Sequence, residues 1–283
     1  SHGVRGFGRF RVNVYRQRGV VGACLRAITN TVATRTELNL PRIVEDMVNR
    51  PHGLILVTGA TGAGKSTTLA CMLDIINQTQ SYHIITIEDP IEYIHPHKKS
   101  MINQREVGHD TLTWSNALKG TLREDPDVIL VGEMRDQETI AGTLTAAETG
   151  HLVFSTLHTC DASQTIERVV DVFPPHGQQQ IRVQLSSVLE GVVSQQLVPH
   201  AAGVGRVPAV EILIATPAIR NLIREGKTHQ IYNAIQTGSK LGMQTMEQSL
   251  FELVQSKMVT ADEALAHTMH PDDFKRMVEN TRR

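Results

Sequence analysis

The sequence predicts an α/β fold in which helices cover both faces of a parallel sheet. Short apolar runs rich in β-branched residues alternate with helical segments between residues 54 and 156, as expected of such a sheet. One strand-to-helix junction carries a glycine-rich motif that is typical of phosphate binding in that structural context. Beyond about residue 178 the pattern is mostly helical, so we expect a helical C-terminal part.

The composition of the 283 residues is that of an ordinary soluble protein with one large or two modest domains. The formal net charge of −1 provides no bulk field for nucleic acid, so no nucleic-acid partner is expected. The three cysteines form no C-x-x-C pair and fit a reducing cytoplasm rather than a disulfide framework or zinc site. No apolar run approaches the roughly 18 residues of a transmembrane segment, and no secretory signal is visible.

Residues 1–34 form a basic segment in which two strands are expected. Residues 8–15 alternate apolar and polar side chains, and a second strand is expected at 20–28 after a turn near Gly19. Two strands alone are marginally stable, so we expect the tail of a larger domain whose beginning is missing. The arginines of this segment form either a solvated strand face or a set of guanidinium groups presented to a nucleotide. We place the domain boundary near residue 35.

The next segment is expected to hold one amphipathic helix, followed by a buried strand at residues 54–57. Pro41 suits the first turn of that helix. Its apolar stripe consists of Leu40, Ile43, Val44 and Met47.

The residues after this strand fit the phosphate-loop pattern G-x-x-x-x-G-K-[ST]. They are Gly59, Ala60, Thr61, Gly62, Ala63, Gly64, Lys65 and Ser66. Apolar residues between Leu69 and Ile76 recur at i, i+3, i+4 and i+7, which predicts the helix that must follow. Backbone N–H groups and the helix N-terminus would surround the phosphates, with Lys65 on the β- and γ-phosphates and the Ser66 hydroxyl on Mg²⁺. We therefore expect nucleotide binding.

Three more strands and two helices are expected between residues 84 and 156. The strands are the apolar runs 84–87, 128–131 and 152–156, and the helices cover 113–122 and 136–150. Asp136 is the expected cap of the second helix, and Gly150 ends it. Ligands of parallel sheets bind at the carboxyl ends of the strands, so polar residues at those ends are candidates for the site.

Glu133 is the candidate catalytic acid. Phosphoryl transfer to water needs a group that orients the attacking water, and Glu133 directly follows the apolar strand 128–131. A glutamate side chain is one methylene longer than that of aspartate, which suits a water between the metal and the γ-phosphate. The alternative is a strand-end surface acid. Asp127 precedes the strand and would lie at the opposite end of the sheet, so it is assigned no role.

Two further groups of polar residues leave alternatives open. Glu88, Asp89 and Glu92 would repel one another unless a cation lay among them, so they either serve a metal or a water, or are solvated turn acids. The sequence pattern alone does not show which of the three acids has such a role. His151 and His158 bracket the fourth strand, and they either sense the γ-phosphate or contact a neighbouring subunit, or are simply packed or exposed.

The C-terminal part is expected to be helical. Apolar residues from Ile181 to Val192 predict one long helix, and residues 260–263 form a capping box. Residues 216–226 have a cap, a proline at the first helical position and a terminal glycine. On that helix Arg220 and Arg224 are four residues apart and are expected to project together from an exposed face.

In combination, these segments resemble the motifs of the secretion ATPase superfamily, which covers type II and type IV secretion and type IV pilus motors. Residues 59–67, ending at Thr67, resemble its Walker A motif; 88–92, 131–136 and 150–159 resemble its Asp-box, Walker B and His-box motifs. The helix at 218–225 resembles the signature of the pilus retraction branch. The resemblance spans roughly residues 8 to 265.

The resemblance implies a subunit of two domains. Residues 1–34 would be the C-terminal remnant of a PAS-like α+β N-terminal domain, and 35–283 a RecA-like P-loop NTPase domain with C-terminal helices from about residue 205. ATP and Mg²⁺ would be the cofactors. The subunit would work as a cytoplasmic homo-hexamer at the inner-membrane pilus base, where it would drive pilus retraction by acting on an inner-membrane platform protein.

The resemblance also assigns the residues of the phosphate site. Lys65 and Ser66 would hold phosphate and Mg²⁺. Glu133 matches the catalytic Walker B acid and would reach the metal through water, and Glu92 matches the key acid of the Asp-box.

The remaining assignments concern histidines and arginines. His158, with His151, matches the His-box, and Arg11 and Arg26 are the best matches for arginine fingers of the N-terminal domain. Two departures matter: most of the family's N-terminal domain is absent, and the four-cysteine zinc motif of the extension and type II secretion members is missing. The second departure favours the retraction branch.

Three other functions compete with a pilus motor. A type II or type IV secretion traffic ATPase would use the same fold, and the helix at 218–225 separates it from the retraction branch. A non-hydrolysing nucleotide-dependent switch would bind ATP without releasing phosphate. A nucleic-acid translocase is disfavoured by the neutral charge.

Overall fold

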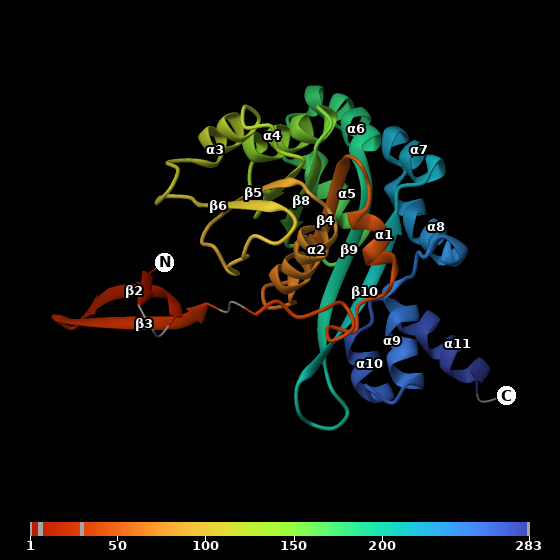
Figure 1. The fold of residues 1–283 in the computed structure, drawn as a ribbon. Helices are drawn as coiled ribbons and strands as arrows, with labels where there is room; N and C mark the ends of the chain where they lie inside the picture. The colour runs from red at the N-terminus through yellow and green to blue at the C-terminus, as the bar shows by residue number, and fades with distance from the viewer. Residues whose placement is uncertain (1, 5–7, 29–30, 282–283) are drawn as a thin grey trace.

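The computed structural model describes residues 2–4, 8–28 and 31–281, and these form two separate sheets (Figure 1). Figure 1 shows the small N-terminal sheet beside the main body, joined to it by the segment that precedes α1. Within the described ranges, no helix has both the length and the apolar character that a membrane crossing requires.

The N-terminal sheet is antiparallel, with the order β1-β2-β3. Its described strands are β1 (His2–Val4), β2 (Gly8–Gln17) and β3 (Val20–Ile28), which confirms the two predicted strands. The turn between β2 and β3 consists of Arg18 and Gly19, both at positive φ, as a tight two-residue hairpin requires. In the register of the hairpin, Arg11 lies directly opposite Arg26.

The main sheet has the order β10-β9-β4-β8-β7-β5-β6 within the described chain. Its strands are β4 (Gly53–Thr58), β5 (His83–Glu88), β6 (Met101–Glu106), β7 (Val128–Val131), β8 (Leu152–Leu157), β9 (Leu189–Pro199) and β10 (Arg206–Ile214). Neighbouring strands are parallel except β10, which runs antiparallel to β9. Every residue of β4, β7 and β8 is buried, as expected for strands covered on both faces.

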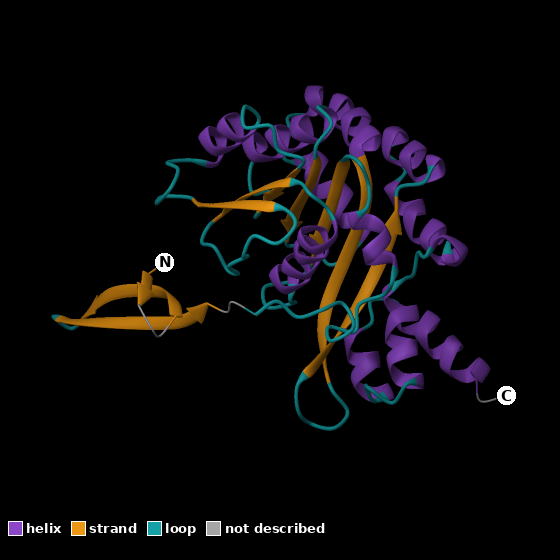
Figure 2. Ribbon diagram, in the orientation of Figure 1, coloured by secondary structure: helices purple, strands orange, loops and turns teal. Residues whose placement is uncertain are grey.

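Helices cover both faces of this sheet, which confirms the predicted α/β class (Figure 2). One face packs on α1 (Ile43–Val48) and α2 (Lys65–Thr79), the other on α3 (Trp114–Thr121), α4 (Gln137–Glu148), α5 (Ala162–Asp171) and α6 (Pro175–Val188). The C-terminal helices are α7 (Pro217–Glu225), α8 (Ile231–Thr237), α9 (Met246–Gln255), α10 (Ala261–His267) and α11 (Pro271–Thr281). The predicted caps Asp136 and Thr216 accept backbone hydrogen bonds at α4 and α7, and Gly226 ends α7 in the left-handed region.

The expected long helix through Val192 is wrong, because α6 ends at Val188 and the chain continues as β9. Leu189 and Val192 happen to continue the helical spacing, and a short buried apolar run fits a strand equally well. The segment forms a strand rather than a helix because it pairs with both β4 and β10. The C-terminal helices consequently begin at Pro217 rather than at about residue 205, since β10 occupies 206–214. The polar edge strand β6 and helix α5 were also not predicted.

Arg220 does not project freely with Arg224, contrary to expectation. Its guanidinium donates to the carbonyl oxygens of Ser186 (2.8 Å) and Ser187 (2.7 Å), which are at the end of α6. It also donates to the Ala215 carbonyl and forms an ion pair with Glu190 on β9. Arg220 therefore holds α7 against the end of α6 and the start of β9.

We predict that Arg220→Ala lowers the free energy of unfolding by about 1–3 kcal/mol, because it leaves carbonyl groups without their donor and removes one of the two arginine partners of the half-buried Glu190 carboxylate. Arg224→Ala is the matched control, since Arg224 is exposed, and its effect should stay within about 0.5 kcal/mol. Urea titrations followed by circular dichroism measure both values. Equal effects of the two substitutions would contradict this role of Arg220.

Candidate functional site

A cavity of about 500 Å³ opens at the carboxyl ends of the central strands. Its wall includes the phosphate loop, residues from 88–92 at the end of β5, residues from 132–135 after β7, and Thr156 and His158 at the end of β8. The parallel strands bring these separate segments of the chain to one edge of the sheet. This is the edge at which the polar residues were expected to meet.

The phosphate loop connects β4 to α2 with Gly59, Gly62 and Gly64 at positive φ. Gly64 is the N-cap of α2 and has no side chain, so no side-chain cap competes with an anion for the first N–H groups of the helix. The fifteen-residue helix directs its positive end at the same place. The loop is therefore shaped to surround phosphate oxygens.

Lys65 lies at the base of this loop with only 8% of its surface exposed. Its Nζ donates to the carbonyl oxygens of Gly59 (2.7 Å) and Ala60 (3.0 Å). Burial lowers the pKa of Lys65, and the charges of Glu133 and Glu92 oppose that shift. A phosphate that entered the loop would add negative charge beside Lys65 and so favour the charged ammonium form that burial disfavours.

His158 connects Lys65 to Glu133. Its Nδ1 is 3.5 Å from Lys65 Nζ, and its Nε2 is 3.2 Å from Glu133 Oε1. The other Glu133 oxygen accepts from Arg135 Nε at 2.8 Å. The structure thus brings the predicted lysine, glutamate and histidine into one contact network, to which it adds Arg135, a residue that sequence reasoning missed.

The acidic segment after β5 contains two glutamates in different settings. Glu88 accepts from Thr86 Oγ1 at 2.7 Å and from Gln104 Nε2 at 3.3 Å, and its burial raises its pKa. Glu92 is exposed and lines the cavity, and its backbone N–H donates to the second Glu88 oxygen. The sequence pattern did not distinguish these two acids, but the geometry does. Glu88 is held by its neighbours, whereas Glu92 is open to a ligand.

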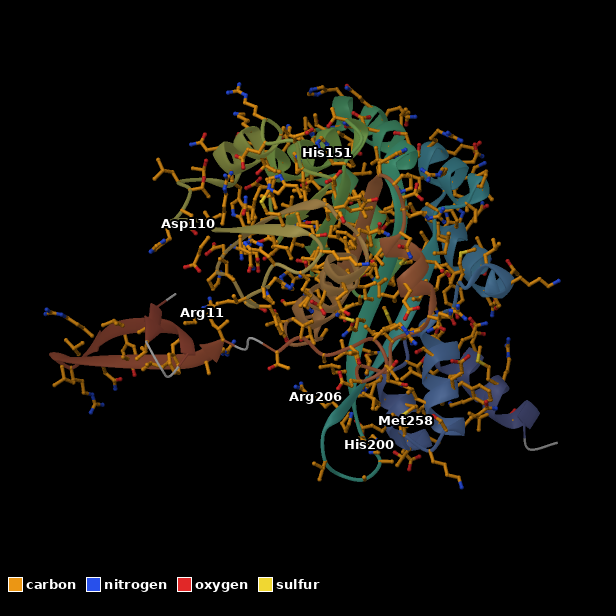
Figure 3. All side chains as sticks on the ribbon, viewed as in Figure 1. Arg11, Asp110, His151, His200, Arg206 and Met258 are labelled. Carbon is orange, nitrogen blue, oxygen red and sulfur yellow. The ribbon has the colours of Figure 1, made fainter. Side chains whose placement is uncertain are left out.

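His151 lies away from this cavity, which corrects its assignment beside His158. It precedes β8, whereas His158 follows it, and six residues of extended strand span about 20 Å. Its Nδ1 is 2.9 Å from the Ala146 carbonyl oxygen and 3.1 Å from Thr149 Oγ1, at the end of α4 (Figure 3). His151 therefore serves the α4–β8 connection at the opposite edge of the sheet.

Arginine side chains approach the cavity from outside the main loops. Arg26 on β3 lines it, and Arg11 lines an adjoining cavity of about 180 Å³ together with Arg26 and residues 90–93. Like charges opposite each other on neighbouring strands are destabilising, so the Arg11 and Arg26 pair favours an anion nearby. Arg206 at the start of β10 also lines the main cavity; it was missed because β10 was not predicted (Figure 3).

Ser66 and Glu133 line the same cavity, as a Mg²⁺ site would require. The described residues contain no group of three or more histidine, cysteine, aspartate or glutamate side chains that could hold a metal ion. An Mg²⁺ ion there would take most of its ligands from phosphate oxygens and water, which is its usual preference. Ser66 and Glu133 therefore fit a Mg²⁺ ion that binds together with a nucleotide.

The loop that carries His158 leads into α5, and Glu211 on β10 holds the start of that helix. Glu211 is 3% exposed, and its Oε1 accepts from the Ala162 backbone N–H at 2.8 Å. Burial raises the pKa of Glu211 to about 8. This buried acid ties the β9–β10 hairpin to the loop beside the cavity.

We predict that Glu211→Gln changes the dependence of stability on pH. Between about pH 5 and pH 8 folded Glu211 keeps a proton that the unfolded chain has released, so the wild-type free energy of unfolding falls as pH rises. The amide still accepts from Ala162 but does not titrate, so its advantage over wild type should grow across this interval, by an amount on the order of a few kcal/mol. Urea titrations at pH 5, 6.5 and 8 test this, and parallel curves would contradict it.

Comparisons with known proteins agree with this geometry. The family described as type II/IV secretion system protein matches residues 30–267. The chain is 54% identical over 274 residues to the type IV pilus retractation ATPase PilT of Pseudomonas aeruginosa, covering 97% of this chain and 79% of that protein. It is 55% identical over 256 residues to a twitching motility protein of Neisseria gonorrhoeae, covering 90% and 68%.

Solved structures of ATPases agree with these sequence relationships. The crystal structure of the pilus retraction motor PilT with bound ADP superposes with a TM-score of 0.91 at 54% identity, covering 97% of this chain and 78% of that one. The Legionella pneumophila ATPase DotB superposes with a TM-score of 0.81 at 27% identity, covering 94% and 74%.

Proposed function

The chain belongs to the family of type II/IV secretion system proteins, and from that membership we propose that it is an ATPase that drives type IV pilus retraction in twitching motility. The observation that carries the chemistry is the contact of His158 with both Lys65 and Glu133 at the phosphate loop. The retraction role is supported by the two relatives at more than half identity and by the resemblance of residues 218–225 to the signature of the retraction branch.

In this proposal the phosphate loop binds the β- and γ-phosphates of ATP through its backbone N–H groups. Lys65 exchanges one of its carbonyl partners for a phosphate oxygen, and the Ser66 hydroxyl holds Mg²⁺. When bound, Mg²⁺ neutralises charge on the phosphates during transfer to water. The products are ADP and phosphate.

Glu133 orients the attacking water and accepts its proton. Each of its oxygens has one side-chain partner, His158 or Arg135, and an ionised carboxylate has further acceptor sites that can take the water. His158 lies between the phosphate-binding lysine and the catalytic acid, so its position would report the γ-phosphate. Glu92 contributes negative charge at the mouth of the cavity.

Arg11 and Arg26 act as arginine fingers in the same proposal. Their direct pairing across β2 and β3 presents two guanidinium groups beside the segment 90–93, where a nucleotide phosphate would relieve their repulsion. Residues 1–34 would belong to a PAS-like domain and 35–283 to the RecA-like ATPase domain.

The working assembly that we propose is a cytoplasmic homo-hexamer at the pilus base, acting on an inner-membrane platform protein. Its support is the resemblance to pilus motors together with the names of the relatives, a pilus retractation ATPase and a twitching motility protein. Mass spectrometry of the native assembly with and without ATP tests the hexamer.

We predict that Lys65→Ala abolishes ATP hydrolysis and weakens nucleotide binding by about tenfold or more, because a charge-assisted contact to the phosphates is lost. Lys119→Ala is the control, since Lys119 is exposed on α3 outside the cavity. Phosphate release and nucleotide titrations give both quantities. Near-normal turnover of Lys65→Ala would overturn the proposed site.

We predict that Glu133→Gln still binds ATP but hydrolyses it at least about 10²-fold more slowly, because the amide keeps the shape and removes the proton acceptor. Glu138→Gln, an exposed position in the first turn of α4, should hydrolyse at the wild-type rate. If Glu133→Gln turns over normally while Glu92→Gln does not, the two acids have the opposite roles. A wild-type protein that binds ATP but releases no phosphate would be a switch rather than a motor.

A further inference from the structure

Gln195 on β9 lies directly behind the phosphate loop and is 4% exposed. Its Nε2 donates to the Ala63 carbonyl oxygen at 2.6 Å, and its Oε1 accepts from Thr68 Oγ1 at 2.7 Å. Ala63 belongs to the loop, and Thr68 to the first turn of α2. One amide therefore joins the loop to the helix that follows it.

The backbone of the loop packs on the same residue. A Cβ atom at Gly59 would lie 2.2 Å from the Gln195 carbonyl oxygen, and one at Gly64 would lie 2.7 Å from Gln195 Nε2. Two of the loop's glycines thus permit close approach to Gln195 in addition to their positive φ. The curvature of the loop is set from behind by this strand as well as by its own sequence.

The strand that carries Gln195 is itself fixed beside the root of the loop. β9 pairs in parallel with β4, with Ser194 opposite Thr58, the last residue of β4. The two hydroxyl groups form a buried hydrogen bond of 2.9 Å. A polar group held on a rigid, buried strand positions its partners better than one on a loop.

We propose that Gln195 is a positioning residue that holds the phosphate loop in its nucleotide-binding shape, which deepens the proposed function and rests on it. An amide has the required chemistry because it donates to a carbonyl and accepts from a hydroxyl at once. Methionine would keep the length and provide neither bond. Glutamate would keep the acceptor for Thr68 but place a second oxygen against the Ala63 carbonyl.

The expected signature is a loss of nucleotide affinity without a loss of the chemical step. The loop must be shaped before any phosphate binds, so ATP and ADP are affected alike, and KM rises while kcat is unchanged. A residue that only stabilised the fold would lower the melting temperature and leave KM unchanged.

The chain offers a matched control in the next residue of β9. Gln196 points to the other face of the strand, where its Nε2 donates to the His267 carbonyl oxygen of α10 at 2.9 Å. Gln195→Met and Gln196→Met therefore remove the same side-chain chemistry from opposite faces. Titration of a fluorescent ADP analogue, steady-state ATP hydrolysis and thermal melting are measured on both variants and wild type.

We expect Gln195→Met to raise the ADP Kd and the ATP KM by about tenfold, as loss of a buried hydrogen bond implies, with kcat within about twofold of wild type. Gln196→Met should lower only the melting temperature. Thr68→Val should weaken ADP binding in the same direction, and its effect should not add to that of Gln195→Met, because both remove one shared bond.

Unchanged ADP affinity in Gln195→Met, or equal losses in the two glutamine variants, would overturn the inference. If Gln195→Met does not fold, Thr68→Val and Gln195→Glu decide the question, since unchanged ADP affinity in both would overturn it. The ADP titration does not depend on hydrolysis. A wild-type protein that binds ADP but releases no phosphate would therefore refute the proposed ATPase while the role of Gln195 was still decided, whereas failure to bind ADP would refute both.

Discussion

A nearly buried ammonium group is the constraint on which the rest of the site depends. Removing a charge from water is expensive unless other groups compensate it, and Lys65 is 8% exposed. Its compensation comes from the carbonyl oxygens of Gly59 and Ala60, which the loop can offer only because it curls around the side chain. The rest is the field of Glu133 and Glu92. The carboxylates at the ends of β7 and β5 thus balance the lysine before any phosphate is present.

The order of the strands determines the order of the groups in the site. The sequence β4-β8-β7-β5 across the sheet places, in turn, the phosphate loop with Lys65, then His158, then Glu133, then the segment of Glu92. Neighbouring strands are about 4.8 Å apart, so residues that follow their carboxyl ends come within contact distance without any special folding of the loops. The bridge from Lys65 through His158 to Glu133 is a direct consequence, since β8 lies between β4 and β7.

The central strands and the motif residues could be predicted from the sequence because each strand is a short apolar run with its polar group at one end. The β9–β10 hairpin could not, because Leu189 and Val192 continue the helical spacing of α6. The buried Gln195 and the exposed Arg206 were missed with it, since neither residue could be assigned to the site before its strand was placed. The assignment of His151 to the site was wrong for a different reason. Asp127 was excluded because it precedes its strand, and the same argument applies to His151, which the structure places at that amino-terminal edge of the sheet.

The missed hairpin is also where the C-terminal helices meet the phosphate loop. Arg220 of α7 is bonded to Glu190 near the start of β9, and Gln195 of the same strand is bonded to the loop. Five residues of extended strand separate them, about 17 Å. β9 pairs with β4 on one side and with β10 on the other, and its register with β4 shifts between Leu189 and Gly191, at Glu190. The helix that resembles the retraction signature and the loop that resembles the Walker A motif therefore both contact the same strand, β9.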